Sequence, residues 1–265
     1  MRSDVLRNSP EELRRGITDG RIALPRVWGA LSIRSVLPFG MLISVAAVMQ
    51  LSGHPRPVAA SSAWWLWFVS ITNIACFLVL SRAARSEGLR LRDIYYFNPT
   101  TWRTDVRWFL IGLAGIAVVG LLPGILLSGL LWSDPNYPNA LLLQPLPVAA
   151  VLPLFVIMPT TQALAELPVY WGYVAPRLRA GGMNRWLVVA IVGGVLSLQH
   201  VFFSFQLDPR YIVWLALRFL PFALWTGFLV DRRPTVLPYL MAVHFLMDAS
   251  LPVLTYLVST GDLVL

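Results

Sequence analysis

Seven apolar runs divide this chain of 265 residues, and each is close to the ~20 residues that an α-helix needs to cross a bilayer. So many long apolar runs predict an all-α fold, a polytopic bundle of about seven transmembrane helices. We place the predicted spans at about Ser35–Leu51, Ala63–Ser81, Trp108–Trp132, Pro147–Val174, Trp186–Phe205, Tyr211–Val230 and Thr235–Leu257.

The charged residues fit the same class of protein. They make up only 13% of the chain, too few to cover a soluble domain of this size, and the net charge is +8 with arginine as the only basic residue type. Because these arginines lie mostly between the apolar runs, we interpret them as topology signals and contacts to anionic lipid, not as a nucleic-acid surface. We therefore expect membrane lipids as partners, no nucleic acid, and a bacterial cytoplasmic membrane as the location.

Arginine-rich and arginine-poor loops alternate along the whole chain. The N-terminal segment and the loops after the second, fourth and sixth spans are rich in arginine. This alternation predicts that the N-terminus is inside the cell, with residues 1–26 as a cytosolic segment and 27–265 as a single transmembrane domain. The sequence Ser9-Pro10-Glu11-Glu12 predicts the start of a short helix, because it combines a capping box with proline at the first helical position.

Two loops carry further expectations. The segment Leu89–Phe97 has the pattern of a helix along the inner membrane interface, with its aromatic residues in lipid. The segment Ser133–Pro147 contains four prolines and is predicted to be an irregular outer loop. Arg34 is interpreted as the charged edge of the first span.

Ionisable residues interrupt four of the later spans. Glu166 lies in the fourth, His200 in the fifth, Arg218 in the sixth, and His244 and Asp248 in the seventh. Counting from the nearest inner arginine at ~1.5 Å per residue puts all five about 16–22 Å above the inner charges. Charges at that depth are costly and usually mark a functional site, so we expect these side chains to meet inside the bundle.

Pro168 supports a cavity at this depth. It removes a backbone donor two residues after Glu166 and should kink the helix beside the carboxylate. Irregular backbone inside a membrane is tolerated only where it faces protein or a wet cavity. The sequence thus predicts a pocket around Glu166.

These motifs resemble those of the CPBP family, the CAAX proteases and bacteriocin-processing intramembrane endopeptidases, over roughly Gln162 to Ser250 within a core of about 147–257. Glu166 matches the first glutamate of the family's Glu-Glu-x-x-x-Arg motif, His200 matches its lone histidine, and His244 with Asp248 matches its His-x-x-x-Asn/Asp motif. The chain has Leu167 and Trp171 where the family has its second glutamate and its arginine. Arg218 is a conjectured replacement for the lost positive charge.

The resemblance implies an intramembrane endopeptidase that hydrolyses a membrane-embedded or membrane-anchored peptide or protein. In that interpretation the catalytic residues are Glu166, His200, His244 and Asp248. Glu166 activates the attacking water, the two histidines orient the water and stabilise the oxyanion, and Asp248 tunes His244. No cofactor is expected.

Four alternatives stay open. The altered first motif also fits a catalytically inactive membrane scaffold, chaperone or immunity protein. One glutamate and two histidines could instead bind zinc through Glu166, His200 and His244. Acid and imidazole chains also form proton relays in transporters, although no internal repeat is evident in this chain. Finally, Glu166 and Arg218 could be a purely structural ion pair.

Overall fold

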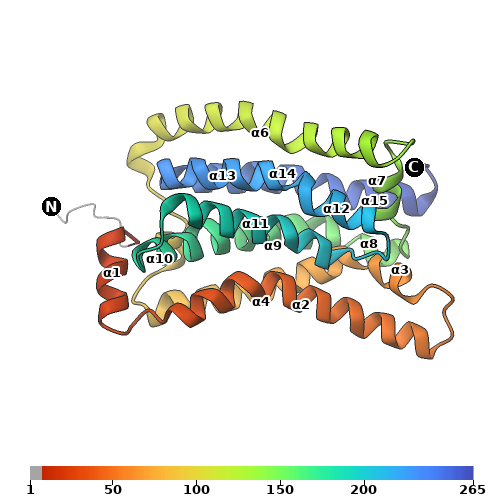
Figure 1. Cartoon of the computed structure of the whole chain (residues 1–265), viewed down its shortest axis with the longest axis horizontal. Helices are drawn as coiled ribbons and strands as arrows, with labels where there is room; N and C mark the ends of the chain where they lie inside the picture. The colour runs from red at the N-terminus through yellow and green to blue at the C-terminus, as the bar shows by residue number, and fades with distance from the viewer. Residues whose placement is uncertain (1–7, 265) are drawn as a thin grey trace.

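The computed structural model describes residues 8–264 as a bundle of long, roughly aligned helices (Figure 1). Seven helical stretches are long and apolar enough to cross a membrane, which confirms the predicted all-α polytopic bundle, and the described residues contain no β-strand. The α-helices are α1 (Pro10–Thr18), α2 (Leu24–Leu51), α3 (Pro57–Ser62), α4 (Trp65–Ser86), α5 (Leu91–Ile94), α6 (Trp102–Leu131), α7 (Tyr137–Leu142), α8 (Val148–Val151), α9 (Leu154–Leu167), α10 (Ala175–Ala180), α11 (Arg185–Phe203), α12 (Pro209–Arg218), α13 (Leu220–Arg232), α14 (Leu237–Asp248) and α15 (Ser250–Thr260), joined in places by the 3₁₀ turns η1 (Pro99–Thr101) and η3 (Pro234–Val236) and by the π-helix η2 (Pro168–Val174).

The first span differs most from its predicted bounds. It was expected to begin at Ser35, just after Arg34, but α2 begins at Leu24 and continues unbroken through Arg34. The prediction was wrong because it treated an arginine as the edge of the span. Arg34 is fully buried among other helices, where polar side chains satisfy its charge.

The short helix at the N-terminus is confirmed. α1 begins at Pro10, and the Ser9 hydroxyl accepts a hydrogen bond from the backbone N–H of Glu12 at 3.4 Å. α1 packs against α10 at the same end of the bundle. In addition, the Asn8 side-chain amide donates to the Gly172 carbonyl at 3.0 Å, which attaches the N-terminal segment to the centre of the bundle.

The fourth span passes through the centre of the bundle and changes its helical geometry there. Pro168 cannot donate to the Leu164 carbonyl, and from this residue the chain continues as the π-helix η2. The Tyr95 hydroxyl donates to that carbonyl at 3.2 Å and so supplies the missing bond. All seven residues of η2 are buried, so this irregular segment faces protein on every side.

The segment that supplies Tyr95 packs into the bundle more deeply than was predicted. Within Leu89–Phe97, α5 covers only Leu91–Ile94, and Ile94 and Tyr96 are buried in the core with Phe97 exposed. The backbone of Ile94 lies directly against Gly172 of η2. The prediction that the aromatic residues of this segment lie in lipid was therefore wrong for Tyr96, whose side chain packs in the core.

The other loop prediction was also partly wrong. Ser133–Pro147 contains the short helix α7, and the Leu142 carbonyl at its end accepts a hydrogen bond from the Trp65 indole at 3.0 Å. Pro138 lies in the first turn of α7, where a missing N–H costs little.

Candidate functional site

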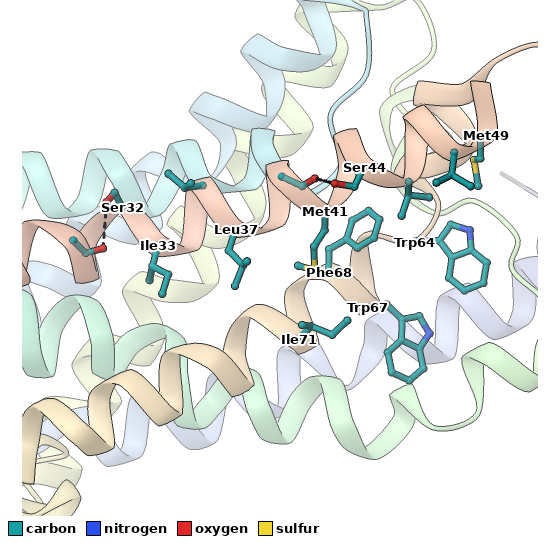
Figure 2. Close-up of a pocket in the computed structure, with 15 residues that line it drawn as sticks. Ser32, Ile33, Leu37, Met41, Ser44, Met49, Trp64, Trp67, Phe68 and Ile71 are labelled. Atoms are coloured by element: carbon teal, nitrogen blue, oxygen red, sulfur yellow. Dashed lines mark hydrogen bonds between the residues drawn. The ribbon is translucent and has the colours of Figure 1, made fainter. Parts of the chain in front are cut away.

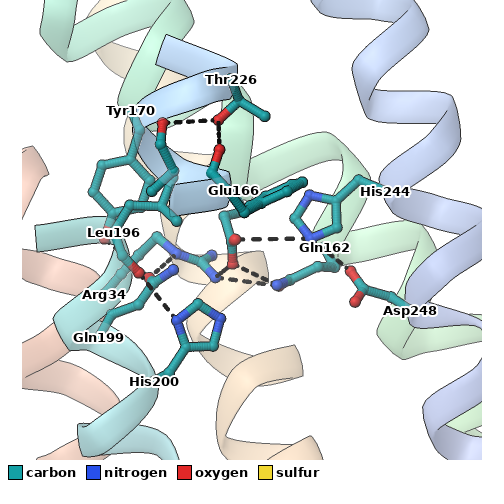
Figure 3. Close-up of polar contacts among 12 residues, drawn as sticks. Arg34, Gln162, Glu166, Tyr170, Leu196, Gln199, His200, Thr226, His244 and Asp248 are labelled. Atoms are coloured by element: carbon teal, nitrogen blue, oxygen red, sulfur yellow. Dashed lines mark hydrogen bonds and ion pairs between the residues drawn. The ribbon is translucent and has the colours of Figure 1, made fainter. Parts of the chain in front are cut away.

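Glu166 forms an ion pair in the middle of the bundle. Its Oε2 atom lies 2.6 Å from Nη2 of Arg34, and the two side chains are 1% and 0% exposed (Figure 3). Arg34 comes from α2 and Glu166 from α9, far apart in the sequence but packed around the same core. The positive partner of Glu166 is therefore Arg34, and the conjectured pairing with Arg218 is corrected.

Three amides complete the shell around the Arg34 guanidinium. Nε donates to Gln199 at 2.8 Å, Nη1 donates to Asn73, and Nη2 donates to Gln162 at 3.1 Å as well as to Glu166. Gln162 in turn donates to Glu166 Oε2, and the Tyr170 hydroxyl donates to Gln199 at 2.9 Å. Four hydrogen bonds to buried side chains thus surround the Arg34 guanidinium.

The site predicted from the sequence did not include Arg34, Asn73 or Gln199. A usable signal existed for Arg34, because apolar residues flank it on both sides over several helical turns. Asn73 is an isolated carboxamide within an apolar span and offered the same kind of signal. Arg34 and Asn73 both lie outside the motifs that carry the family resemblance.

His244 and Asp248 lie on the opposite side of Glu166. His244 Nε2 is 2.9 Å from Asp248 Oδ2, as their spacing of one helical turn on α14 predicts, and 3.7 Å from Glu166 Oε1. Nε2 faces two carboxylates and therefore carries a proton. Nδ1 is buried and contacts no described hydrogen-bonding group.

His200 shares the site but is held differently. Its Nδ1 lies 3.0 Å from the Leu196 carbonyl and 3.2 Å from the Ser197 carbonyl, so this nitrogen is the donor. The ring stacks on Phe219 with centroids 3.8 Å apart. Within residues 8–264 no hydrogen bond or ion pair joins His200 to Glu166 or His244, and in the neutral tautomer its Nε2 is an acceptor.

Arg218 ends α12 at the break between α12 and α13. Its guanidinium lies 4.1 Å from the Trp214 ring and 4.7 Å from the Phe219 ring, and Gly124 of α6 leaves room for it. Nε and Nη1 are buried and donate to no described residue, and no described carboxylate lies within ion-pairing distance. Arg218 thus brings unused donors to the site.

These side chains share one cavity of about 210 Å³. Its walls include all five ionisable residues that were predicted to meet, namely Glu166, His200, Arg218, His244 and Asp248. The predicted convergence of four spans at one depth is confirmed. The cavity has room for several water molecules but is smaller than the ~300 Å³ of a small ligand pocket.

The two residues that depart from the family motif are packed in the core. Leu167 and Trp171 are 1% and 2% exposed, and the Trp171 ring fills the space above Gly227 of α13. An arginine at position 171 would have to place its charge where that indole lies. Arg34 brings the positive charge to Glu166 from another helix instead.

A zinc site formed by Glu166, His200 and His244 does not fit this geometry. No group of three or more His, Cys, Asp and Glu side chains between residues 8 and 264 is arranged to hold a metal ion. Arg34 already neutralises Glu166, and a cation beside a fixed guanidinium would be repelled.

Fold and site together define the class: a polytopic all-α bundle with two carboxylates, two imidazoles and one guanidinium group around one cavity, and a second guanidinium, that of Arg34, paired with Glu166. No family model, curated protein or solved structure matches this chain.

Proposed function

We propose that this protein is an intramembrane endopeptidase of the CPBP type, in a bacterial cytoplasmic membrane, which hydrolyses a membrane-embedded or membrane-anchored peptide or protein. The observation that carries the proposal is the convergence of Glu166, His200 and His244 on one buried cavity. The order and spacing of these residues along the chain match the family's motifs.

The two carboxylate oxygens of Glu166 have different surroundings: one is hydrogen-bonded within the protein and the other is free to accept a bond from water. Oε2 is occupied by Arg34 and Gln162. Oε1 accepts no hydrogen bond from any described residue, and it faces His244 at 3.7 Å, which is too long for a direct bond. A water in the cavity beside Oε1 would donate to it, so Glu166 acts as the general base, with His200 Nε2 as a second acceptor that orients the water.

Donors for the tetrahedral oxyanion come from two other side chains of the lining. His244, when both ring nitrogens carry a proton, offers Nδ1–H, and Arg218 offers Nε–H and Nη1–H. One preorganised donor of this kind contributes ~3 kcal/mol to transition-state stabilisation. Arg218 therefore has a role at the site that does not depend on Glu166.

A second candidate function is a catalytically inactive membrane scaffold. Two observations favour it: the tight pairing of Arg34 with Glu166, and a cavity of about 210 Å³ that must widen before a peptide could bind. In that interpretation the polar network serves only to fix the helices.

The substitution Glu166→Gln separates the two functions in a variant shown to be folded, because glutamine keeps the shape of the side chain but cannot act as a base. It also leaves the Arg34 charge without its partner, so folding is measured first. The purified full-length chain would be reconstituted in proteoliposomes with a library of membrane-anchored peptides, and new termini detected by mass spectrometry. We expect the wild type to cleave and Glu166→Gln to lose at least ~100-fold of the rate.

Glu12→Gln is the matched control, because Glu12 lies on α1, far along the chain from the cavity and partly exposed. It should cleave as the wild type does. Cleavage that persists unchanged in a folded Glu166→Gln variant contradicts the peptidase proposal. A wild type that never cleaves, with its cellular phenotype intact in Glu166→Gln, supports the scaffold.

A further inference from the structure

An apolar groove of about 1240 Å³ runs along the outer faces of α2 and α4 (Figure 2). Ile33, Leu37 and Met41 line it from α2, and Phe68 and Ile71 line it from α4. Trp64 and Trp67 close one end. From Ile33 to Val48 the lining extends ~22 Å along α2. This length exceeds the ~15 Å thickness of the hydrocarbon layer in one leaflet.

The groove has little polar character of its own. The hydroxyls of Ser32 and Ser44 donate to carbonyls of α2 itself, at 3.1 Å and 2.8 Å, and so turn away from the open space. Gly29 and Gly40 have no side chain, and a Cβ at either would meet nothing within 4 Å. The groove is therefore apolar along its length and not a polar binding site.

A second hollow, of about 490 Å³, continues the groove at the end opposite the tryptophans. The two hollows share Gly29 and Ile33 in their walls. The second one is lined by three arginines, Arg21, Arg26 and Arg82. The apolar groove and this second hollow, which we call the basic mouth, thus form one continuous surface feature.

The charge at this mouth is uncompensated. Arg26 and Arg82 are exposed and form no ion pair with any described residue. The one carboxylate there, Glu87, is buried and already bound by Arg177 and by the Tyr173 hydroxyl, the latter at 2.8 Å. A ligand with a negative group would therefore meet two free guanidinium groups.

We propose that the α2–α4 groove binds one anionic phospholipid. The headgroup phosphate lies between Arg26 and Arg82, and an acyl chain lies along Ile33, Leu37 and Met41 toward Trp64. The apolar groove binds the acyl chain, which a soluble anion lacks. The basic mouth favours an anionic headgroup over a neutral one. This site is on the lipid side of α2, away from Arg34 and the cavity, and does not depend on the proposed peptidase activity.

Native mass spectrometry of the full-length chain in detergent tests the proposal directly. The protein would be titrated with phosphatidylglycerol and with phosphatidylcholine that carry the same acyl chains. We expect one tight phosphatidylglycerol adduct and weaker phosphatidylcholine binding. The double variant Arg26→Gln/Arg82→Gln should weaken the phosphatidylglycerol adduct ~25-fold, about 5-fold for each arginine.

Two matched controls separate this site from general lipid attraction. Arg85→Gln/Arg92→Gln removes the same charge from exposed arginines outside both hollows and should leave the adduct unchanged. Gly40→Leu places a side chain in the groove, at a position where a Cβ meets nothing within 4 Å, and should remove the adduct. Gly129→Leu, where a Cβ also meets nothing within 4 Å, should not. Equal binding of the two lipids, or equal weakening by both arginine pairs, overturns the proposal.

Discussion

At the scale of single residues, Arg34 and Glu166 hold each other in place in the interior of the bundle. Each is fully buried, and each satisfies a charge that the bilayer core would otherwise reject. The surrounding amides of Gln162, Gln199 and Asn73 make the pair a network with its own geometry.

Removing one partner should therefore be severe. We expect Arg34→Met to lower the free energy of unfolding by ~3–5 kcal/mol, because it leaves an unpaired buried carboxylate. The double variant Arg34→Met/Glu166→Gln should recover part of that loss, since no net charge is then buried. Denaturant unfolding of the detergent-purified protein measures both.

Arg26→Met is the control for this pair, because it removes an exposed arginine from the same helix. Its effect on unfolding should stay within ~0.5 kcal/mol. If Arg34→Met proved equally mild, the ion pair would not be a stabilising element of the bundle.

The sequence predicted the members of the site better than their contacts. Glu166, His200, Arg218, His244 and Asp248 share a depth that can be counted from loop arginines, and they do line one cavity. Which groups pair could not be counted in that way. Which charged side chains form an ion pair depends on how whole helices rotate and pack. In this bundle that packing puts Arg34, and not Arg218, beside Glu166.

At the scale of elements, the π-helix η2 is the centre of the bundle. Gly172 lies where η2 meets the loop after α4, and a Cβ there would be 2.5 Å from the Ile94 carbonyl oxygen. The Gly172 carbonyl also accepts the bond from Asn8. The chain can therefore approach this closely only without a side chain.

Gly172→Ala should destabilise the protein by ~1–3 kcal/mol, because backbone atoms must move to make room. Gly129→Ala in α6 is the matched control, since its Cβ meets nothing within 4 Å. Thermal unfolding of both variants measures the difference. A Gly172→Ala variant as stable as Gly129→Ala would contradict the close packing of η2 against α5.

The sequence indicated a disturbance at Pro168 but not its form. A proline predicts a kink, whereas a π-helix depends on what surrounds it, here the Tyr95 hydroxyl that reaches the Leu164 carbonyl. For the same reason Leu89–Phe97 was predicted to lie at the membrane surface. Its amphipathic pattern fits a headgroup layer and a protein groove equally well, and only the fold distinguishes them.

At the scale of the whole molecule, the loops that join the spans carry the topology prediction. Arginine-rich loops lie at one end of the bundle, beside α1, and the tryptophan-lined end of α4 lies at the other (Figure 1). The arginine asymmetry predicts that the α1 end faces the cytoplasm.

Single-cysteine labelling tests this orientation, because Cys76 is the only cysteine and is buried. In a Cys76→Ala background, a membrane-impermeant maleimide should label Asn136→Cys in intact cells. It should label Ser86→Cys only after the membrane is made permeable. The reverse pattern would invert the predicted topology.

The hydrogen bond between Tyr95 and Leu164 has a consequence for how this protein tolerates change. Surface loops usually accept inserted residues at little thermodynamic cost. We expect the connection after α4 to tolerate insertions poorly, because its length determines where Tyr95 lies. The Tyr95 hydroxyl bonds to the carbonyl of Leu164, two residues before Glu166. An epitope tag inserted after Gly88 should therefore abolish accumulation of the protein, whereas the same tag after Pro55, between α2 and α3, should be accepted.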